Sequence, residues 1–236
     1  LIAPPAPERR PALRLSLTRS GSFHDDPPRS SGRKGELPPP VTGGRPLGRG
    51  VSDFWALMGC NAIVFGTSVC IMVLELTASR LIAPYVGSSL YTWTSVIGVV
   101  LAGISLGNYL GGWLSDRFAP QKLLAWLFLI SGLLTLSVLL LNGWAANTAR
   151  PEGTSWQMWV MFVVGWVFFL PALSLGTISP VTASMALKRS AKTGMTVGNI
   201  YAWGAMGSIV GTFLTGFWLI GEFGSREVIC VTSCAL

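Results

Sequence analysis

Long apolar stretches separated by short polar ones cover most of this chain. A helix needs about 20 apolar residues to cross the hydrocarbon core of a bilayer. Five stretches are of that order: Phe54–Leu74, Tyr91–Leu114, Leu123–Leu141, Trp156 to about Leu187, and Thr196–Ile220. After Glu227 only nine further residues follow, too few to cross. The pattern predicts an all-α, polytopic membrane helix bundle with five full transmembrane helices and a truncated sixth.

The first 50 residues lack this pattern. They hold ten of the fifteen prolines and no apolar period. Such a segment buries too little apolar surface to offset the entropy cost of ordering it. We expect residues 1–50 to form a disordered, Pro- and Arg-rich tail, and residues 51–236 to form the transmembrane domain.

Composition supports a lipid bilayer as the main partner. The chain is 50% hydrophobic and 11% charged, with a mean hydropathy of +0.55, whereas soluble domains carry about 25% charged residues. The sequence pI of 9.7 could suggest nucleic acid, but the cations lie in the tail and at helix ends, with no basic folded face. His24 is the single histidine, and the four cysteines lie in apolar segments without zinc-ligand spacing. We expect no metal and no cofactor.

The basic residues also predict an orientation. Eight cations would lie on the side of the tail and three on the other side: Lys34, Arg45, Arg49, Arg117, Lys122, Lys188, Arg189 and Lys192 against Arg80, Arg150 and Arg226. Loops rich in Lys and Arg stay in the cytoplasm. We therefore expect a cytoplasmic N terminus.

Small residues recur every four positions in two of the spans. Gly103, Gly107 and Gly111 lie on one face of the second span, and Gly207 and Gly211 repeat the spacing in the fifth. Such stripes let helix backbones approach closely in lipid. The fourth span instead contains Pro171 and Pro180, which should kink it or break its hydrogen-bond ladder.

Glu75 and Arg80 interrupt the apolar pattern between the first two spans. Glu75 lies 20 residues beyond Trp55, or about 30 Å along a helix, which places it at the outer edge of the core, with Pro84 ending the helix. One interpretation is a charged boundary pair at the mouth of a helical hairpin. The other is a polar group that lines an outward cavity and binds a ligand.

Three asparagines lie at similar distances from the charged segment ends: Asn61, Asn108 and Asn199. At 1.5 Å per residue, each would lie about 10–12 Å inside the cytoplasmic boundary. We predict that at least two of them face each other, or a common water, in the bundle interior. The alternative is that each amide bonds its own backbone.

Three stretches together resemble a known family, the bacterial membrane-bound spermidine synthase-like proteins. They are LELTASRLIAPYVGSSLYTWTSVIGVVLAG (Leu74–Gly103), LPALSLGTISPVTA (Leu170–Ala183) and GNIYAWGAMGSIVGTFLTGFWLI (Gly198–Ile220). The resemblance implies a major-facilitator-like half in a bacterial inner membrane, and it adds Tyr201 to the candidate ligand residues. The family's aminopropyltransferase part has a glycine-rich loop and acidic residues that this chain lacks, so we expect no catalytic site here.

A second resemblance lies within the first. GGWLSDRF (Gly111–Phe118) is similar to the G-x-L-x-D-R motif of major-facilitator transporters, matched by Gly112, Leu114, Asp116 and Arg117. It would lie in a cytoplasmic loop after the second span. The family's following glycine and basic residues are replaced by Ala119, Pro120 and Gln121, which leaves a switching role open.

Three functions remain compatible with these residues. The first is a transporter-like or ligand-sensing bundle for a small cation such as a polyamine, for which alternating access would need a dimer because a second six-helix half is lacking. The second is an anchoring subunit that forms a homodimer or joins other membrane subunits, which the glycine stripes favour. The third is a fragment of an aminopropyltransferase whose catalytic domain is encoded downstream.

Overall fold

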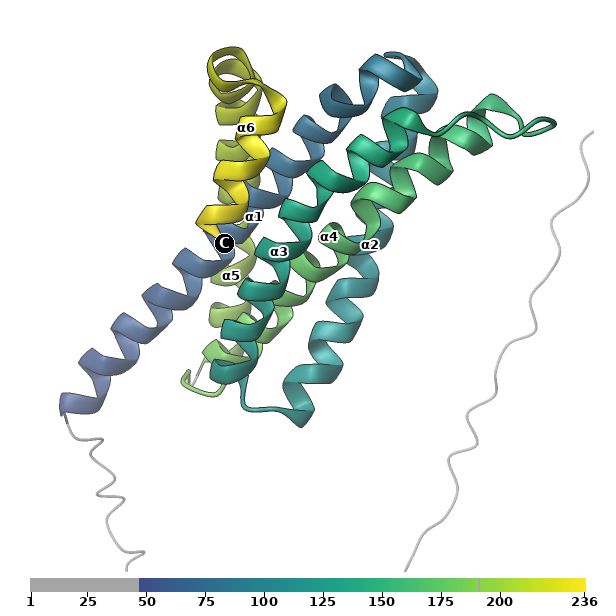
Figure 1. Ribbon diagram of the computed structural model, residues 1–236. Coiled ribbons are helices and arrows are strands. Elements are labelled where there is room, and N and C mark those ends of the chain that lie inside the picture. The colour runs from purple at the N-terminus through teal and green to yellow at the C-terminus, as the bar shows by residue number, and fades with distance from the viewer. Residues whose placement is uncertain (1–46, 191) are drawn as a thin grey trace, which may run out of the picture. The chain divides into compact units, whose positions relative to one another are not determined.

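Helices account for nearly all of the described chain. The computed structural model describes residues 47–190 and 192–236, so the predicted tail lies outside the described residues except for its last four positions. Within the described ranges there is no strand (Figure 1). The elements in chain order are α1 (Leu47–Val86), α2 (Leu90–Arg117), α3 (Pro120–Asn147), α4 (Trp156–Leu187), α5 (Thr193–Leu214), the π-helical turn η1 (Thr215–Leu219) and α6 (Ile220–Ala235).

The helices confirm the predicted all-α bundle and its five membrane-length segments. In the described part of the chain, five helical segments are long and apolar enough to cross a membrane: Asp53–Val86, Leu90–Arg117, Pro120–Asn147, Trp156–Leu187 and the continuous stretch Thr193–Ala235. Each contains one of the five predicted spans. The chain is a multi-pass, apolar helical bundle suited to a lipid bilayer.

Helix α4 is the centre of the bundle. It packs against α2, α3 and α1, and 56% of its most apolar window is buried, against 17% for the segment formed by α5, η1 and α6. Its valines and Phe168 form the middle of the main hydrophobic core. The other helices therefore keep broad apolar faces outward, which suits contact with lipid.

The two prolines do not break α4. The helix is continuous from Trp156 to Leu187 with Pro171 and Pro180 inside it. Hydroxyl groups near the prolines bond to backbone carbonyls of the preceding turn, as in the bond from Ser174 Oγ to Pro171 O of 2.9 Å and that from Thr182 Oγ1 to Ile178 O of 2.8 Å. Of the two predicted alternatives, a kink or a break, the structure does not show a break, since the helix stays continuous through both prolines; neighbouring helices make a proline tolerable within a membrane helix.

The glycine stripe of α2 is a close-packing face, as predicted, and its partner is α4. A Cβ atom on Gly103 would lie 2.8 Å from Ala172 Cβ, and one on Gly111 would lie 2.5 Å from the Thr177 carbonyl oxygen. Between them, a Cβ on Gly107 would overlap the Leu173 carbonyl oxygen. The backbones of α2 and α4 are thus too close for any side chain along this seam.

A second seam joins α5 to α1. A Cβ on Gly207 would overlap the Phe65 carbonyl oxygen, and one on Gly211 would lie 2.9 Å from Val69 Cα. Residue numbers rise together along both helices, so α1 and α5 run parallel. This seam is the main attachment of α5, because α5 has only a small contact with α4.

Helix α1 is much longer than the predicted first span. It continues through Glu75, Arg80 and Pro84 to Val86, and the Gly87 N–H donates to the Ala83 carbonyl oxygen at 2.9 Å. Gly87 has a φ of 77°, a left-handed conformation that glycine adopts without a steric penalty. The helix continues beyond Leu74, where the predicted apolar stretch ends, because one face of the following turns is buried in the core; it ends at Val86, close to the predicted end at Pro84.

The last helical segment turns back toward the bundle. Gly224 has φ 74° and ψ 161°, which interrupts the helical path within α6. Beyond it α6 packs against α3, where Ser233 Oγ donates to the Gly132 carbonyl oxygen at 2.7 Å. About eleven residues of α6 follow this turn, roughly 17 Å of helix.

Candidate functional site

The segment of α1 around Glu75 is the first candidate site. The Glu75 side chain is half-buried, and two nearby residues, Leu74 and Thr77, are among the most buried positions of the helix. Glu75 lies 22 residues past Asp53, about 33 Å along the helix. The residue is therefore inside a continuous helix and not at its end.

Arg80 does not pair with Glu75. Five helical residues correspond to a rotation of about 140° beyond a full turn, and only side chains three or four residues apart are neighbours on a helix surface. Arg80 is exposed, and no ion pair within 4.0 Å joins the two side chains among the described residues. The charged boundary pair is not formed.

The π-helical turn lies close to this part of α1. Gly207 meets Phe65 and Gly211 meets Val69, a constant offset of 142 residues along the α1–α5 seam. Continued along the two parallel helices, the same offset brings Thr215–Leu219 beside Val73–Thr77, and α1 does contact η1. Short π-helical turns occur frequently at functional sites.

Several buried oxygen atoms have no hydrogen-bond partner in the described part of the chain. They belong to α1, α3 and η1: Thr77 Oγ1, Ser131 Oγ, Thr135 Oγ1, Asn142 Oδ1 and Thr215 Oγ1. Such groups inside a membrane bundle are costly, because lipid offers no alternative partner. Their presence makes the interior of the helix bundle more polar than the hydropathy profile of the sequence suggests.

Asn142 also links α3 to α1. Its amide Nδ2 donates a hydrogen bond to the hydroxyl oxygen of Tyr85, and the residue is only 2% exposed. Ser131, Thr135 and Asn142 lie four and seven residues apart, which places them on one face of α3. Sequence reasoning missed these residues, although that spacing within an apolar helix is a readable signal.

The predicted layer of three asparagines is not formed. Asn61 is buried in α1, with 6% of its surface exposed, but Asn108 and Asn199 are exposed on α2 and α5. The layer fails because the asparagine side chains point in different directions around their helices. Asn108 follows Gly107, which faces α4, so it points about 100° away from the seam. Equal depth does not bring side chains together.

Tyr201 lies on the outward face of α5, where 75% of its surface is exposed. It does not join Glu75 or the buried oxygen atoms. Within the described residues, no group of three His, Cys, Asp or Glu side chains could hold a metal ion.

The transporter-like motif lies in a helix and not in a loop. Gly112, Leu114, Asp116 and Arg117 all belong to the last two turns of α2. The Arg117 guanidinium carbon lies 4.2 Å from the centroid of the Trp113 ring, a cation–π contact between residues four apart. The helix runs to Arg117, so the predicted loop shrinks to the short connection before Pro120.

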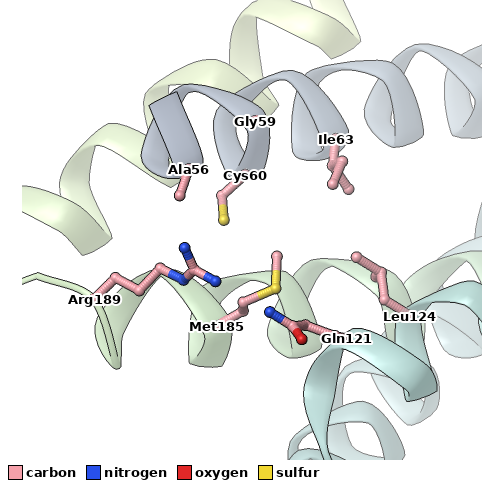
Figure 2. Close-up of a pocket in the computed structure, with 8 residues that line it drawn as sticks. All are labelled: Ala56, Gly59, Cys60, Ile63, Gln121, Leu124, Met185 and Arg189. Carbon is pink, nitrogen blue, oxygen red and sulfur yellow. The ribbon is translucent and has the colours of Figure 1, made fainter. Parts of the chain in front are cut away.

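A second candidate site lies at the end of the bundle that carries Arg117, Lys122, Lys188, Arg189 and Lys192, here called the basic end. A cavity of about 310 Å³ opens there between α1, α3 and α4. Figure 2 shows the Arg189 and Gln121 side chains directed toward the Cys60 side of α1. Sequence reasoning used Arg189 only to orient the chain and did not place it in a site.

These features define a class: a polytopic, all-α membrane protein with two glycine seams, a half-buried carboxylate and a basic cavity. In comparisons with known proteins, no family model matches the chain, and no curated protein or solved structure matches it. The resemblance to spermidine synthase-like proteins therefore stays a prediction.

Proposed function

We propose that this bundle is a transporter-like or ligand-sensing membrane domain for a small cation such as a polyamine. The observation that carries the proposal is Glu75, a half-buried carboxylate within α1 whose charge no ion pair balances among the described residues. Ionisable residues inside membrane segments generally mark ligand or ion pathways. The proposal also follows the resemblance to membrane-bound spermidine synthase-like proteins, with aminopropyl transfer left to residues outside this chain.

The buried oxygen atoms support a cationic ligand over an anionic one. A protonated amine carries only hydrogen-bond donors, and the unpartnered oxygens of Thr77 and Thr215 can accept from it. Thr77 belongs to α1 and Thr215 to η1, two elements that are in contact. The Thr77 side chain lies on the other face of α1 from Glu75, so these oxygens add acceptors to the bundle interior and Glu75 alone supplies the charge.

The test is ligand-dependent stabilisation of the purified full chain in detergent. Spermidine is titrated while the melting temperature is followed by tryptophan fluorescence, for wild type, Glu75→Gln and Glu152→Gln. Glu152 is the matched control, because it is an exposed carboxylate in the α3–α4 loop. At ten times the Kd, binding stabilises the folded state by about 1.4 kcal/mol. We expect this gain in wild type and Glu152→Gln, and its loss in Glu75→Gln.

Two results would remove the proposal. One is a wild-type melting temperature that does not respond to millimolar polyamine. The other is an equal response in Glu75→Gln, which would show that polyamines act elsewhere. Sodium chloride at matched ionic strength separates specific binding from general screening of charge.

The exposed face of α5 favours a second function, that of a subunit in a larger membrane assembly such as a homodimer. α5 is held mainly by its seam with α1, and its outward side carries large apolar residues such as Ile209 and Phe213. In a cysteine-free background, Ile209→Cys should then crosslink between copies in membranes, whereas Leu133→Cys on the exposed face of α3 should not. Equal crosslinking at both positions would contradict this function.

We also propose that the chain lies in a bacterial inner membrane with the basic end in the cytoplasm. The support is the excess of Lys and Arg at that end, which follows the positive-inside rule.

A further inference from the structure

The cavity at the basic end has an apolar floor and a polar rim. Three helices that are far apart in sequence contribute to it, and its volume of about 310 Å³ is at the lower end of the roughly 300–1,000 Å³ common for ligand sites. The floor is formed by Cys60, Ile63, Leu124 and Met185, and the rim by Gln121 and Arg189. This combination suits an amphiphilic ligand better than a fully polar one.

The charge at the rim is positive. Among the described residues, Arg189 is the one charged residue that lines the cavity, and its guanidinium can donate two parallel hydrogen bonds to a phosphate group. Helix α3 begins at Pro120 with no side-chain cap, and its first turn contributes Gln121 to the lining, so the positive end of the helix dipole lies near the cavity. Asp53 and Asp116 are the carboxylates described at this end, against five cations.

A second hollow lies on the outward face of α3. It has a volume of about 290 Å³ and is lined by Lys122, Ala125, Trp126 and Leu129. These residues lie three and four positions apart and so form one stripe of the helix. Lys122 and Gln121 are neighbours in sequence, so the two hollows flank the first turn of α3. An apolar stripe that starts at a lysine and a tryptophan is typical of a membrane–water interface.

We propose that these two hollows form a binding site for an anionic phospholipid. The phosphate group would contact Arg189 and the first turn of α3, and an acyl chain would lie along Ala125–Leu129. Basic pockets between transmembrane helices are suited to anionic headgroups, because each Lys or Arg near the surface adds attraction for them. The site is separate from Glu75, and the proposal does not depend on the cation-binding function.

Lipid binding by the full chain in neutral detergent tests this site. Native mass spectrometry can count bound lipid and give an apparent Kd for phosphatidylglycerol and, in parallel, for phosphatidylcholine. We expect Arg189→Gln to weaken phosphatidylglycerol binding about fivefold to tenfold. Lys188→Gln is the matched control, since it removes one exposed cation from the adjacent residue that does not line the cavity, and it should change the Kd less than about twofold.

A second pair of variants tests the cavity without changing charge. Gly59 lines the cavity and Gly66 does not, while a Cβ atom meets nothing within 4 Å at either position. Gly59→Leu should fill the cavity and weaken binding, whereas Gly66→Leu should leave it unchanged. Lipid-free melting temperatures of all four variants identify any that fold poorly, and the other pair then decides.

Three outcomes would overturn the proposal. The first is equal weakening by Arg189→Gln and Lys188→Gln, which indicates diffuse attraction. The second is phosphatidylcholine binding as tight as that of phosphatidylglycerol. The third is displacement of the lipid by soluble glycerol phosphate at the same concentration. That result would make this a site for free phosphate compounds and would leave the second hollow, along Ala125–Leu129, without a role.

Discussion

Replacing Gly107 by alanine should loosen α2 from α4. A Cβ atom at this position would overlap the Leu173 carbonyl oxygen and lie 3.0 Å from Gly176 Cα. Backbone atoms cannot rotate away as the tip of a side chain can, so the two helices must separate. Because α2 has only small contacts with α1 and α3, its attachment to the bundle depends on this seam.

The magnitude follows from two opposing effects. Overpacking costs about 1–3 kcal/mol, and the rigid backbone contact favours the upper end of that range. Alanine is also preferred over glycine inside a helix by about 0.8–1.0 kcal/mol. Gly107→Ala should therefore destabilise the bundle by about 2 kcal/mol. Gly112→Ala, where a Cβ meets nothing within 4 Å, should be neutral or slightly stabilising.

Unfolding from mild detergent with increasing sodium dodecyl sulfate, followed by tryptophan fluorescence, measures both variants on one scale. The helix-preference term is common to the two substitutions, so their difference isolates the packing cost of about 3 kcal/mol. Equal stability of Gly107→Ala and Gly112→Ala would refute the close approach of α2 and α4 at Leu173.

Three further results are expected. A cysteine introduced at Ser190 should react with reagents from the cytoplasm and one at Thr154 from outside; reversed labelling would overturn the proposed orientation. Tyr85→Phe removes the hydroxyl that accepts from Asn142 and should lower the free energy of unfolding by about 1–3 kcal/mol, whereas no change would mean that the amide finds another partner. Gly207→Ala should release α5 from α1, seen as faster proteolysis near the α4–α5 loop, and wild-type resistance to protease would contradict that seam.

The order of the helices and both seams could be predicted from sequence, because each rests on a local signal. An apolar run of sufficient length defines a span, and glycine at every fourth position defines the face that packs. At Gly103 and Gly211 the spacing of the glycines indicates the packing face independently of the sequence elsewhere in the chain. The sequence did not show which helix each stripe packs against. The pairing of α2 with α4 and of α5 with α1 depends on the whole bundle.

The errors have a different origin, which is local context. Glu75 and Arg80 were expected to form a charged pair within a helix ending at Pro84; α1 is helical on both sides of them, but the two side chains do not pair. Asp116 and Arg117 were placed in a loop after the second span, although they complete α2. A charged side chain needs a polar environment on its own side only, and the opposite face of the same turn can stay in the core.

Glu75 lies where α1 changes its packing partner. Earlier turns of α1 meet α5 through Phe65, Val69 and Met72, while later turns bury Ala78 and Ile82 in the core around α4. At this point the neighbouring element is η1. Its π-helical turn alters the direction of the side chains that follow α5. The carboxylate lies between these two packed regions and stays half-exposed. In the proposed function, a cation reaches the carboxylate through the part of the side chain that the bundle leaves open.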